Sequence, residues 1–278
     1  MSSTTKPQPT ITLYRGFPGS STYTWSPFVT KLETRLRLAN LSYKCQAGSI
    51  PNAPRGKVPY VAISQPDDSI KGEKQEEPVV IADSTLIVEK LVKDEVIEEE
   101  LNEGLDPVEE ARDLAVRALL EDKLNFYQIH EKWIKNYYTM RSKVLDSIPW
   151  PIQIIVGLII HRGVVKTLHG QGTGRFTDAE ISVFKREVWE SVNALLVAAK
   201  RGGGTTSVEE GGEGEEPFWV LGGKGPSEAD TTVFGFVAST LVCASAPESQ
   251  QIIRSFPVVL DYARRIHARY FPDYECWE

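Results

Sequence analysis

The stretch that decides the fold is GKVPYVAI, residues 56–63. Its last six residues are mainly β-branched or aromatic and predict a strand that begins with the bond between Val58 and Pro59. Proline has no backbone N–H, so within a sheet it is confined to edge positions or to the first residue of a strand. X–Pro bonds are cis in only a few per cent of cases. The residues alone therefore also fit the alternative in which Pro59 merely starts an edge strand.

Upstream of this strand, the chain predicts a strand, a helix and a second strand. Residues 11–14 (ITLY) and 41–46 (LSYKCQ) are the two strands. The helix begins at Ser26 and Pro27, because serine is a good N-cap and proline is tolerated at the first helical position. Its apolar face is formed by Phe28, Leu32, Leu36 and Ala39. A strand–helix–strand unit of this kind predicts a parallel pair of strands joined by a crossover.

Downstream, residues 79–81 (VVI) predict a short fourth strand that forms a hairpin with residues 58–63. An acidic loop at residues 66–78 separates the two strands. Asp83 and Ser84 then cap a helix. The order of strand, helix, strand, strand, strand, helix predicts a thioredoxin-like α/β domain, which we place at residues 11–98.

Strand patterns disappear after Asp106, and the remainder predicts an all-helical domain at residues 105–278. Helical patterns run from Asp106 towards Val144, over 178–200, over 227–242 and over 252–268. Ser227 and Asp230 form a capping-box pattern. Residues 202–216 (GGGTTSVEEGGEGEE) are too polar to be buried and predict a flexible loop, and residues 1–10 predict a disordered leader.

Composition narrows the functional classes. A net charge of −7 argues against a nucleic-acid partner, and three cysteines without a CxxC pair argue against a disulfide framework or a zinc site. No metal is expected. The start of the chain lacks an apolar signal, so we expect a cytoplasmic protein. Residues 149–160 (PWPIQIIVGLII) are apolar but shorter than the roughly 20 residues of a membrane span. We expect them to form a buried helix, the alternative being a segment that touches a membrane.

Three motifs resemble the glutathione transferase superfamily. Ser26-Pro27-Phe28 is similar to the segment that opens the first helix in several classes, residues 56–59 are similar to the G-x-V-P element, and Asp83-Ser84 is similar to the pair that holds the γ-glutamyl end of glutathione. The Ser227–Asp230 pattern resembles the S-x-A-D box of the transferase helical domain. The same segments, together with residues 169–175 and 221–230, are similar to the failed-axon-connections and metaxin branch.

The resemblance implies roles for these residues. Ser26 would donate a hydrogen bond to the glutathione thiolate at the positive end of a helix, the alternative being that Ser26 is only a helix cap. Lys57, Val58 and a cis Pro59 would position the peptide backbone of glutathione like an added strand. Asp83 and Ser84 would hold the amino-acid end, the alternative being that either residue is simply an N-cap.

Three further residues are reserve candidates. Tyr14 and Tyr23 are alternative thiol-activating hydroxyls, and Arg175 is a candidate for a carboxylate in the cleft between the domains. The expected function is that of a glutathione-transferase-like enzyme with glutathione as co-substrate and a small apolar electrophile as second substrate, in detoxification or secondary metabolism. The alternative is a non-catalytic, metaxin-like adaptor. A homodimer is usual in the resembling superfamily, and no membrane partner is expected.

Overall fold

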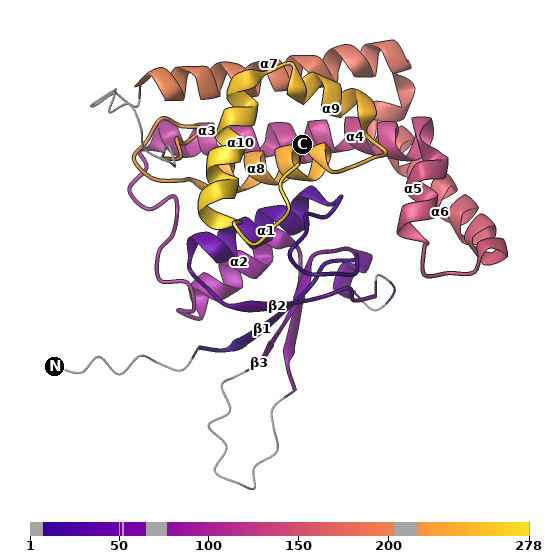
Figure 1. Ribbon diagram of the computed structural model, residues 1–278, viewed down its shortest axis with the longest axis horizontal. Coiled ribbons are helices and arrows are strands. Elements are labelled where there is room, and N and C mark those ends of the chain that lie inside the picture. The colour runs from indigo at the N-terminus through magenta and orange to yellow at the C-terminus, as the bar shows by residue number, and fades with distance from the viewer. Residues whose placement is uncertain (1–7, 50, 52, 65–76, 203–215, 278) are drawn as a thin grey trace, which may run out of the picture.

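A computed structural model describes residues 8–49, 51, 53–64, 77–202 and 216–277. The predicted leader at residues 1–10, the acidic loop at 66–78 and the Gly/Glu loop at 202–216 lie almost entirely outside the described residues. In the described part, the N-terminal portion builds a sheet with helices on one side, and everything from residue 107 onward that has regular structure is helical (Figure 1).

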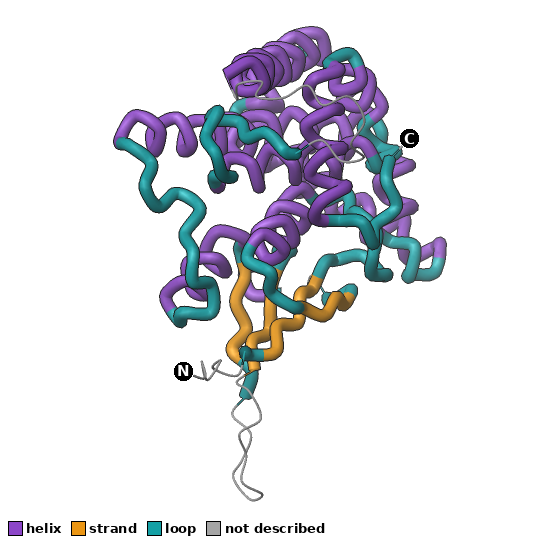
Figure 2. Tube along the Cα trace, turned by 60° about the vertical axis from the view of Figure 1, so that its left-hand side comes forward, coloured by secondary structure: helices purple, strands orange, loops and turns teal. Residues whose placement is uncertain are grey.

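The sheet confirms the predicted order of strands. Its members are β1 (Thr10–Tyr14), β2 (Tyr43–Gln46), β3 (Tyr60–Ser64) and β4 (Val79–Ala82). In space they follow the order β2-β1-β3-β4, with β1 and β2 parallel and the other two pairs antiparallel. Figure 2 shows this sheet at one end of the molecule, with the helical part above it. The parallel pair and the hairpin inferred from the sequence are therefore both present.

Two helices, α1 (Pro27–Leu38) and α2 (Ser84–Lys93), cover one face of the sheet. Alternation along β1 sends Ile11 and Leu13 into the core between the sheet and these helices. A short 3-10 turn, η1 (Pro54–Gly56), leads from β2 towards β3. Because β1, β3 and both helices share one core, the start of each helix is fixed relative to the start of β3.

The helical part begins with a rod in which two π-helical segments interrupt the α-helix. It comprises α3 (Pro107–Ala118), η2 (Leu119–Leu124), α4 (Asn125–His130) and η3 (Glu131–Lys135). The sequence predicted one helix to Val144, but the backbone breaks at Asn136, where φ is −117° and ψ is 37°. In the described residues, six α-helices and one short 3-10 turn follow: α5 (Tyr137–Val144), α6 (Trp150–Gln171), η4 (Thr173–Arg175), α7 (Asp178–Gly202), α8 (Glu228–Leu241), α9 (Pro247–Arg254) and α10 (Pro257–Tyr270).

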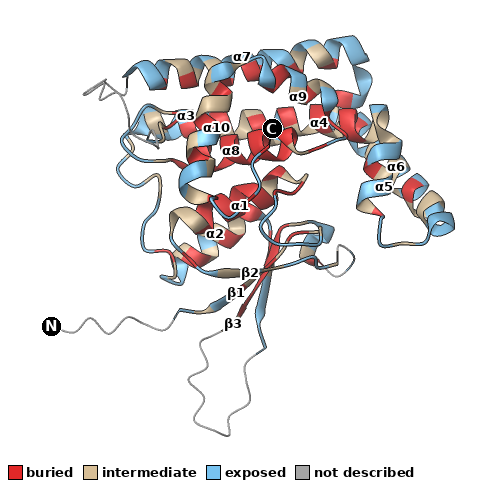
Figure 3. Ribbon diagram, viewed as in Figure 1, coloured by how far each residue is buried: buried red, intermediate tan, exposed pale blue. Residues whose placement is uncertain are grey.

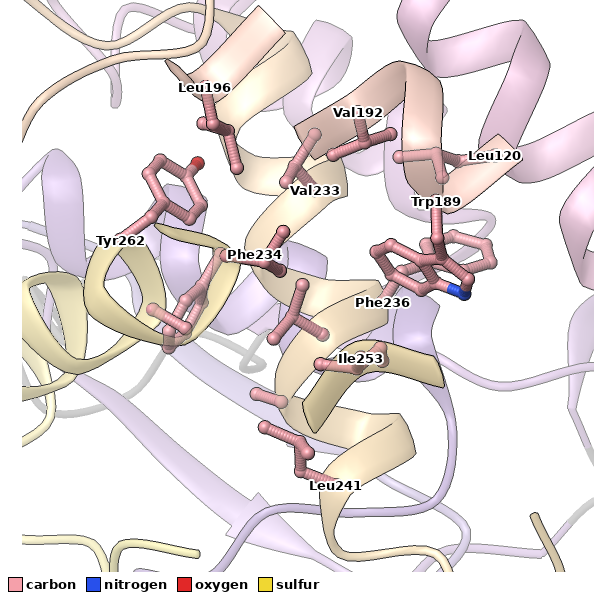
Figure 4. Close-up of a cluster of buried hydrophobic side chains, with 14 of the residues drawn as sticks. Leu120, Trp189, Val192, Leu196, Val233, Phe234, Phe236, Leu241, Ile253 and Tyr262 are labelled. Carbon is pink, nitrogen blue, oxygen red and sulfur yellow. The ribbon is translucent and has the colours of Figure 1, made fainter. Parts of the chain in front are cut away.

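Helix α8 is the centre of the helical domain, and nearly all of its residues are buried. In Figure 4, Trp189 and Val192 of α7 and Phe234 of α8 point into one apolar cluster. The predicted capping box at Ser227 and Asp230 is confirmed. Burial raises the pKa of Asp230 to about 6, against the lowering effect of hydrogen bonds from the N–H groups of Ser227 and Val220.

Helix α1 packs on α8 at very close range. A Cβ added to Gly235 of α8 would lie 2.7 Å from the carbonyl oxygen of Pro27, so the two backbones touch and only glycine fits there. Ion pairs flank the contact, joining Arg35 to Glu228 at 2.8 Å and Lys31 to Glu121 at 2.7 Å. The helical domain thereby fixes the first turn of α1, which carries Ser26.

The apolar segment at residues 149–160 is not buried, contrary to the expectation from its composition. It forms the first half of α6, and the best 18-residue window of this helix has a mean hydropathy of 1.4 with only 11% of its residues buried. Among the described helices, α6 alone is long and apolar enough to cross a membrane. The reason for its exposure is geometric, because α5 and α6 stand out from the body of the domain and leave one face of α6 without a protein neighbour (Figures 1 and 3).

Candidate functional site

The bond between Val58 and Pro59 is cis, as the resemblance implied. Pro59 is buried directly before β3, whereas Val58 is half-buried and Lys57 is exposed. The loop between β1 and α1 reaches this point, because a Cβ at Gly16 would lie 3.1 Å from Cγ2 of Val58. The loop that leads towards Ser26 therefore touches the start of β3.

The start of α2 contacts Pro59, directly before β3. The backbone N–H of Asp83 donates to the carbonyl oxygen of Pro59 at 3.4 Å. Asp83 has φ of 87°, in the left-handed region that a non-glycine residue seldom occupies, and this turns the chain sharply from β4 into the helix. Its carboxylate accepts from the N–H of Thr85 at 3.0 Å, so the predicted N-cap is present. Ser84, the first residue of α2, is buried beneath it.

Ser26 occupies the N-cap position of α1 but does not cap it. Its φ of −97° and ψ of 114° are those of an N-cap, yet its hydroxyl makes no hydrogen bond to the first turn. The first backbone N–H groups of α1 are thus not satisfied by this side chain, and the helix dipole leaves a partial positive charge beside the half-buried hydroxyl. Such a helix end attracts an anion.

A second source of positive charge, Lys132 of η3, was not anticipated from the sequence. Its side chain is 5% exposed, and its Nζ donates to the carbonyl oxygen of Trp25 at 3.2 Å. Among the described residues, no carboxylate forms an ion pair with it. The adjacent acid, Glu131, instead binds Lys185 at 2.6 Å. A buried ammonium is costly without a counter-ion, so this charge favours a negative group near the carbonyl oxygen of Trp25.

A faint sequence signal for Lys132 exists in hindsight. Leu124, Gln128 and Lys132 follow one another at intervals of four, and all three are buried on one side of the rod. Lysine side chains usually lie in solvent, so a lysine on a buried helix face is a candidate for a functional residue. The partner it faces, the peptide between Trp25 and Ser26, comes from more than 100 residues away and is invisible to local periodicity.

The three reserve candidates lie in different parts of the structure. Tyr14 stacks on Tyr60 with 4.4 Å between ring centroids, on the sheet face opposite α1. Tyr23 is buried, its hydroxyl is 2.8 Å from Nδ1 of His267, and burial raises its pKa well above the ordinary value. Arg175 is exposed in η4, which packs on α6 and α4 of the helical domain. Tyr14 therefore packs in one small cluster with Val58, next to Pro59, and Tyr23 lines a cavity that also includes Trp25, whereas η4 places Arg175 against α6 and α4.

A cavity of about 520 Å³ opens beside the start of α1. Trp25, the residue before Ser26, is part of its wall, together with Phe17 of the β1–α1 loop and Trp277 of the C-terminal segment. Three charged side chains also line it: Lys143, Arg254 and Glu275. Within the described residues, no group of three or more His, Cys, Asp or Glu side chains is arranged to hold a metal ion.

Comparison with known proteins supports the fold. The family model described as the glutathione S-transferase N-terminal domain matches residues 27–140. The fold is that of the glutathione transferases. Glutathione transferase Omega 1C from Trametes versicolor is 17% identical, with a TM-score of 0.51, 97% of this chain covered and 92% of that one.

Two further solved structures share the transferase-like fold of this chain. FzlA from C. crescentus is 16% identical, with a TM-score of 0.51 and coverage of 95% of this chain and 91% of that chain. A glutathione S-transferase from Rhodospirillum rubrum F11 is 15% identical, with a TM-score of 0.50 and coverage of 94% and 89%. At these identities, the likeness establishes the fold and leaves function to the residues of the site.

Proposed function

We propose that this chain binds glutathione along the backbone next to Pro59 and activates its thiol at the start of α1. The observation that carries the proposal is the buried, unpaired ammonium of Lys132 beside the peptide that joins Trp25 to Ser26. The contact between Pro59 and Asp83 supports it, because the start of α2 then lies where the amino-acid end of an added peptide would reach. Asp83 and Ser84 are its binding residues in this proposal, together with Lys57 and Val58.

The chemistry follows from the charge at this junction. A thiol placed there loses its proton more readily, because the helix dipole and the Lys132 ammonium both favour the thiolate. The Ser26 hydroxyl, which caps nothing, donates a hydrogen bond to the thiolate sulfur. The sulfur then attacks an electrophilic carbon of the second substrate and forms a carbon–sulfur bond, while the bond from that carbon to its leaving group breaks and the leaving group departs to solvent as an anion with the electron pair. The thiol proton has already passed to solvent. Ser26 and Lys132 thus act on the nucleophile and do not themselves form a covalent bond.

The cavity beside Trp25 is the room for the second substrate in this proposal. Its aromatic walls suit an apolar compound, as the sequence suggested. Lys143 and Arg254 add positive charge that the sequence did not foresee, so an electrophile with an anionic group also fits. In this proposal, the second substrate can therefore be an apolar compound that carries a carboxylate.

Calorimetric titration with glutathione tests the proposal. Millimolar or tighter binding by the wild type is expected. Ser26→Ala should lower turnover with a generic electrophile roughly tenfold or more while changing the dissociation constant less than threefold, because the lost hydrogen bond matters only to the thiolate. Ser191→Ala, on the exposed side of α7, is the matched control and should change neither quantity. No heat of binding at millimolar glutathione would refute the proposal.

The same titration separates the enzyme from the non-catalytic adaptor, which predicts no glutathione binding. The kinship with the failed-axon-connections and metaxin branch, the cytoplasmic location, the homodimer and a role in detoxification or secondary metabolism are further proposals that rest on the resemblance. Gel filtration with light scattering tests the dimer directly.

A further inference from the structure

Helix α6 carries a surface that a soluble monomer seldom exposes. Large apolar side chains lie uncovered along its first three turns, with Trp150 67% exposed, Ile155 63% and Ile159 64%. Ile152 and Leu158 extend the same surface. Contiguous apolar patches of this kind mark sites of contact with another molecule or with a membrane. Within the described residues, no element of the chain covers them.

The opposite side of α6 is firmly held. A Cβ at Gly157 would lie 2.6 Å from Cδ of Arg141 and 2.7 Å from the Tyr137 hydroxyl, so α5 and α6 pack at close range. The rings of Tyr137 and His161 add an edge contact at 5.0 Å. The two helices form a rigid hairpin, defined here as residues 137–171, and its outer face is the exposed face of α6.

The charge of the hairpin identifies its partner. Residues 137–171 contain four basic residues and one acidic residue, a net charge of +3, whereas the whole chain carries −7 and the rest of it therefore −10. The basic residues are Arg141, Lys143, Arg162 and Lys166, and the acidic one is Asp146. Arg162 and Lys166 are exposed on the same face of α6, directly after the apolar turns. An apolar face continued by cations suits the acyl boundary and the phosphates of an anionic bilayer.

The length of the uncovered stretch decides between lying on a bilayer and crossing it. Ten residues from Trp150 to Ile159 rise about 15 Å, which is half of a hydrocarbon core of roughly 30 Å. Beyond them, Leu168 is 1% exposed and is held by the packing of α6 on η4 and α4. Leu168 therefore anchors the end of α6 in the protein, so the whole helix does not cross the bilayer, and lipid can reach the exposed apolar turns and the cations that follow them.

We propose that the exposed face of α6 docks the protein on the surface of an anionic membrane, with Ile152, Ile155 and Leu158 entering the interface and with Arg162 and Lys166 on the lipid phosphates. The docking departs from the sequence-based expectation that no membrane is involved. It is independent of glutathione binding.

Flotation with vesicles tests the docking. Wild-type protein should float with vesicles of phosphatidylcholine that contain about 30% phosphatidylserine, because anionic lipids attract basic segments of a protein. It should bind pure phosphatidylcholine at least tenfold more weakly. The double variant Ile155→Glu, Leu158→Glu should lose flotation, whereas Val183→Glu, at a side chain 63% exposed on α7, should keep it. Far-UV circular dichroism checks that all variants are folded.

The cations give a second, graded test. Neutralising Arg162→Gln and Lys166→Gln together should weaken binding to the anionic vesicles about thirtyfold at low salt, since each cation near the surface contributes about fivefold. High salt should abolish the difference. Absence of vesicle binding by the wild type, or unchanged binding by the Ile155→Glu, Leu158→Glu variant, would overturn the proposal. A wild-type dimer that this variant makes monomeric, without vesicle binding, would assign the face to a second copy of the chain instead.

Discussion

Helices α1 and α6 invert the usual relation between composition and burial. Helix α1 carries charged residues along most of its length, yet Lys31, Glu33 and Arg35 are all at most 3% exposed. Helix α6 is apolar through its first three turns and is mostly exposed. The difference lies in the neighbours, because α1 is enclosed by the sheet on one side and by α8 on the other, whereas α6 packs on α5, η3, α4 and η4 and still leaves most of its surface exposed.

Each buried charge of α1 has a partner, which is how the enclosure is tolerated. Glu33 accepts from the Tyr274 hydroxyl at 2.6 Å and lies 3.4 Å from Nε of Arg15, which is itself fully buried. Lys31 and Arg35 pair with acids of the helical domain. Charged side chains on α1 thus join the two domains and the C-terminal segment, so most of a helix with a modest apolar face is buried.

The largest effect is expected from breaking this enclosure. Glu33→Ala should lower the free energy of unfolding by roughly 3–5 kcal/mol, because it leaves Arg15 buried without its carboxylate and removes the acceptor of Tyr274. Urea denaturation followed by circular dichroism measures it. Glu190→Ala on the exposed side of α7 should stay within about 0.5 kcal/mol. Equal effects of the two substitutions would show that α1 is not enclosed as described.

The helix that encloses α1 should make stability depend on pH through Asp230. Its pKa is raised from 3.8 to about 6 by burial, so the folded state keeps a proton that the unfolded chain loses. This contribution is complete below pH about 4 and is lost as the pH rises to about 6, roughly 3 kcal/mol in total.

Asp230→Asn removes that titration while keeping the size of the side chain. Between pH about 4 and about 6.5, the wild type should lose roughly 3 kcal/mol more unfolding free energy than the variant does. Urea midpoints at the two pH values measure the difference. Parallel pH profiles for the two proteins would contradict the raised pKa.

An intermediate effect, on chemistry, is expected at the start of α1. In the proposed site, Lys132→Met should raise the pKa of the bound glutathione thiol by roughly one to two units, since a nearby positive charge is lost. Ultraviolet absorbance of the thiolate during a pH titration measures it. Protein stability should be unchanged or higher, because a buried lysine without a carboxylate is replaced by an apolar side chain of similar size. Lys123→Met, exposed on the same rod, is the control.

Sequence reasoning reached the parts of this molecule that local pattern determines. The strands, the hairpin, the caps at Asp83 and Ser227 and the cis bond at Pro59 follow from nearby residues or from the family resemblance. The burial of each helix face did not follow from the sequence, because it depends on which distant element of the chain packs against that face. The apolar run at 149–160 was expected inside, and Lys132 was overlooked, for the same reason: a helix pattern shows a face but not what lies against it.

The smallest effect is expected on the exposed helix, α6. Ile155→Ser on α6 should change the free energy of unfolding by less than about 0.5 kcal/mol, although it removes a large apolar side chain, because that side chain is 63% exposed in the folded state and little burial is lost. Leu32→Ser on α1, fully buried, should cost several kcal/mol by the same measurement. A large loss for Ile155→Ser would mean that α6 is covered in solution by another molecule, and a dependence of that loss on protein concentration would identify the cover as a second copy of this chain. Without such a loss, the apolar face of α6 contributes nothing to folding. An exposed apolar face also lowers the solubility of the protein, which is the reason to look for its function in contact with a membrane or another molecule.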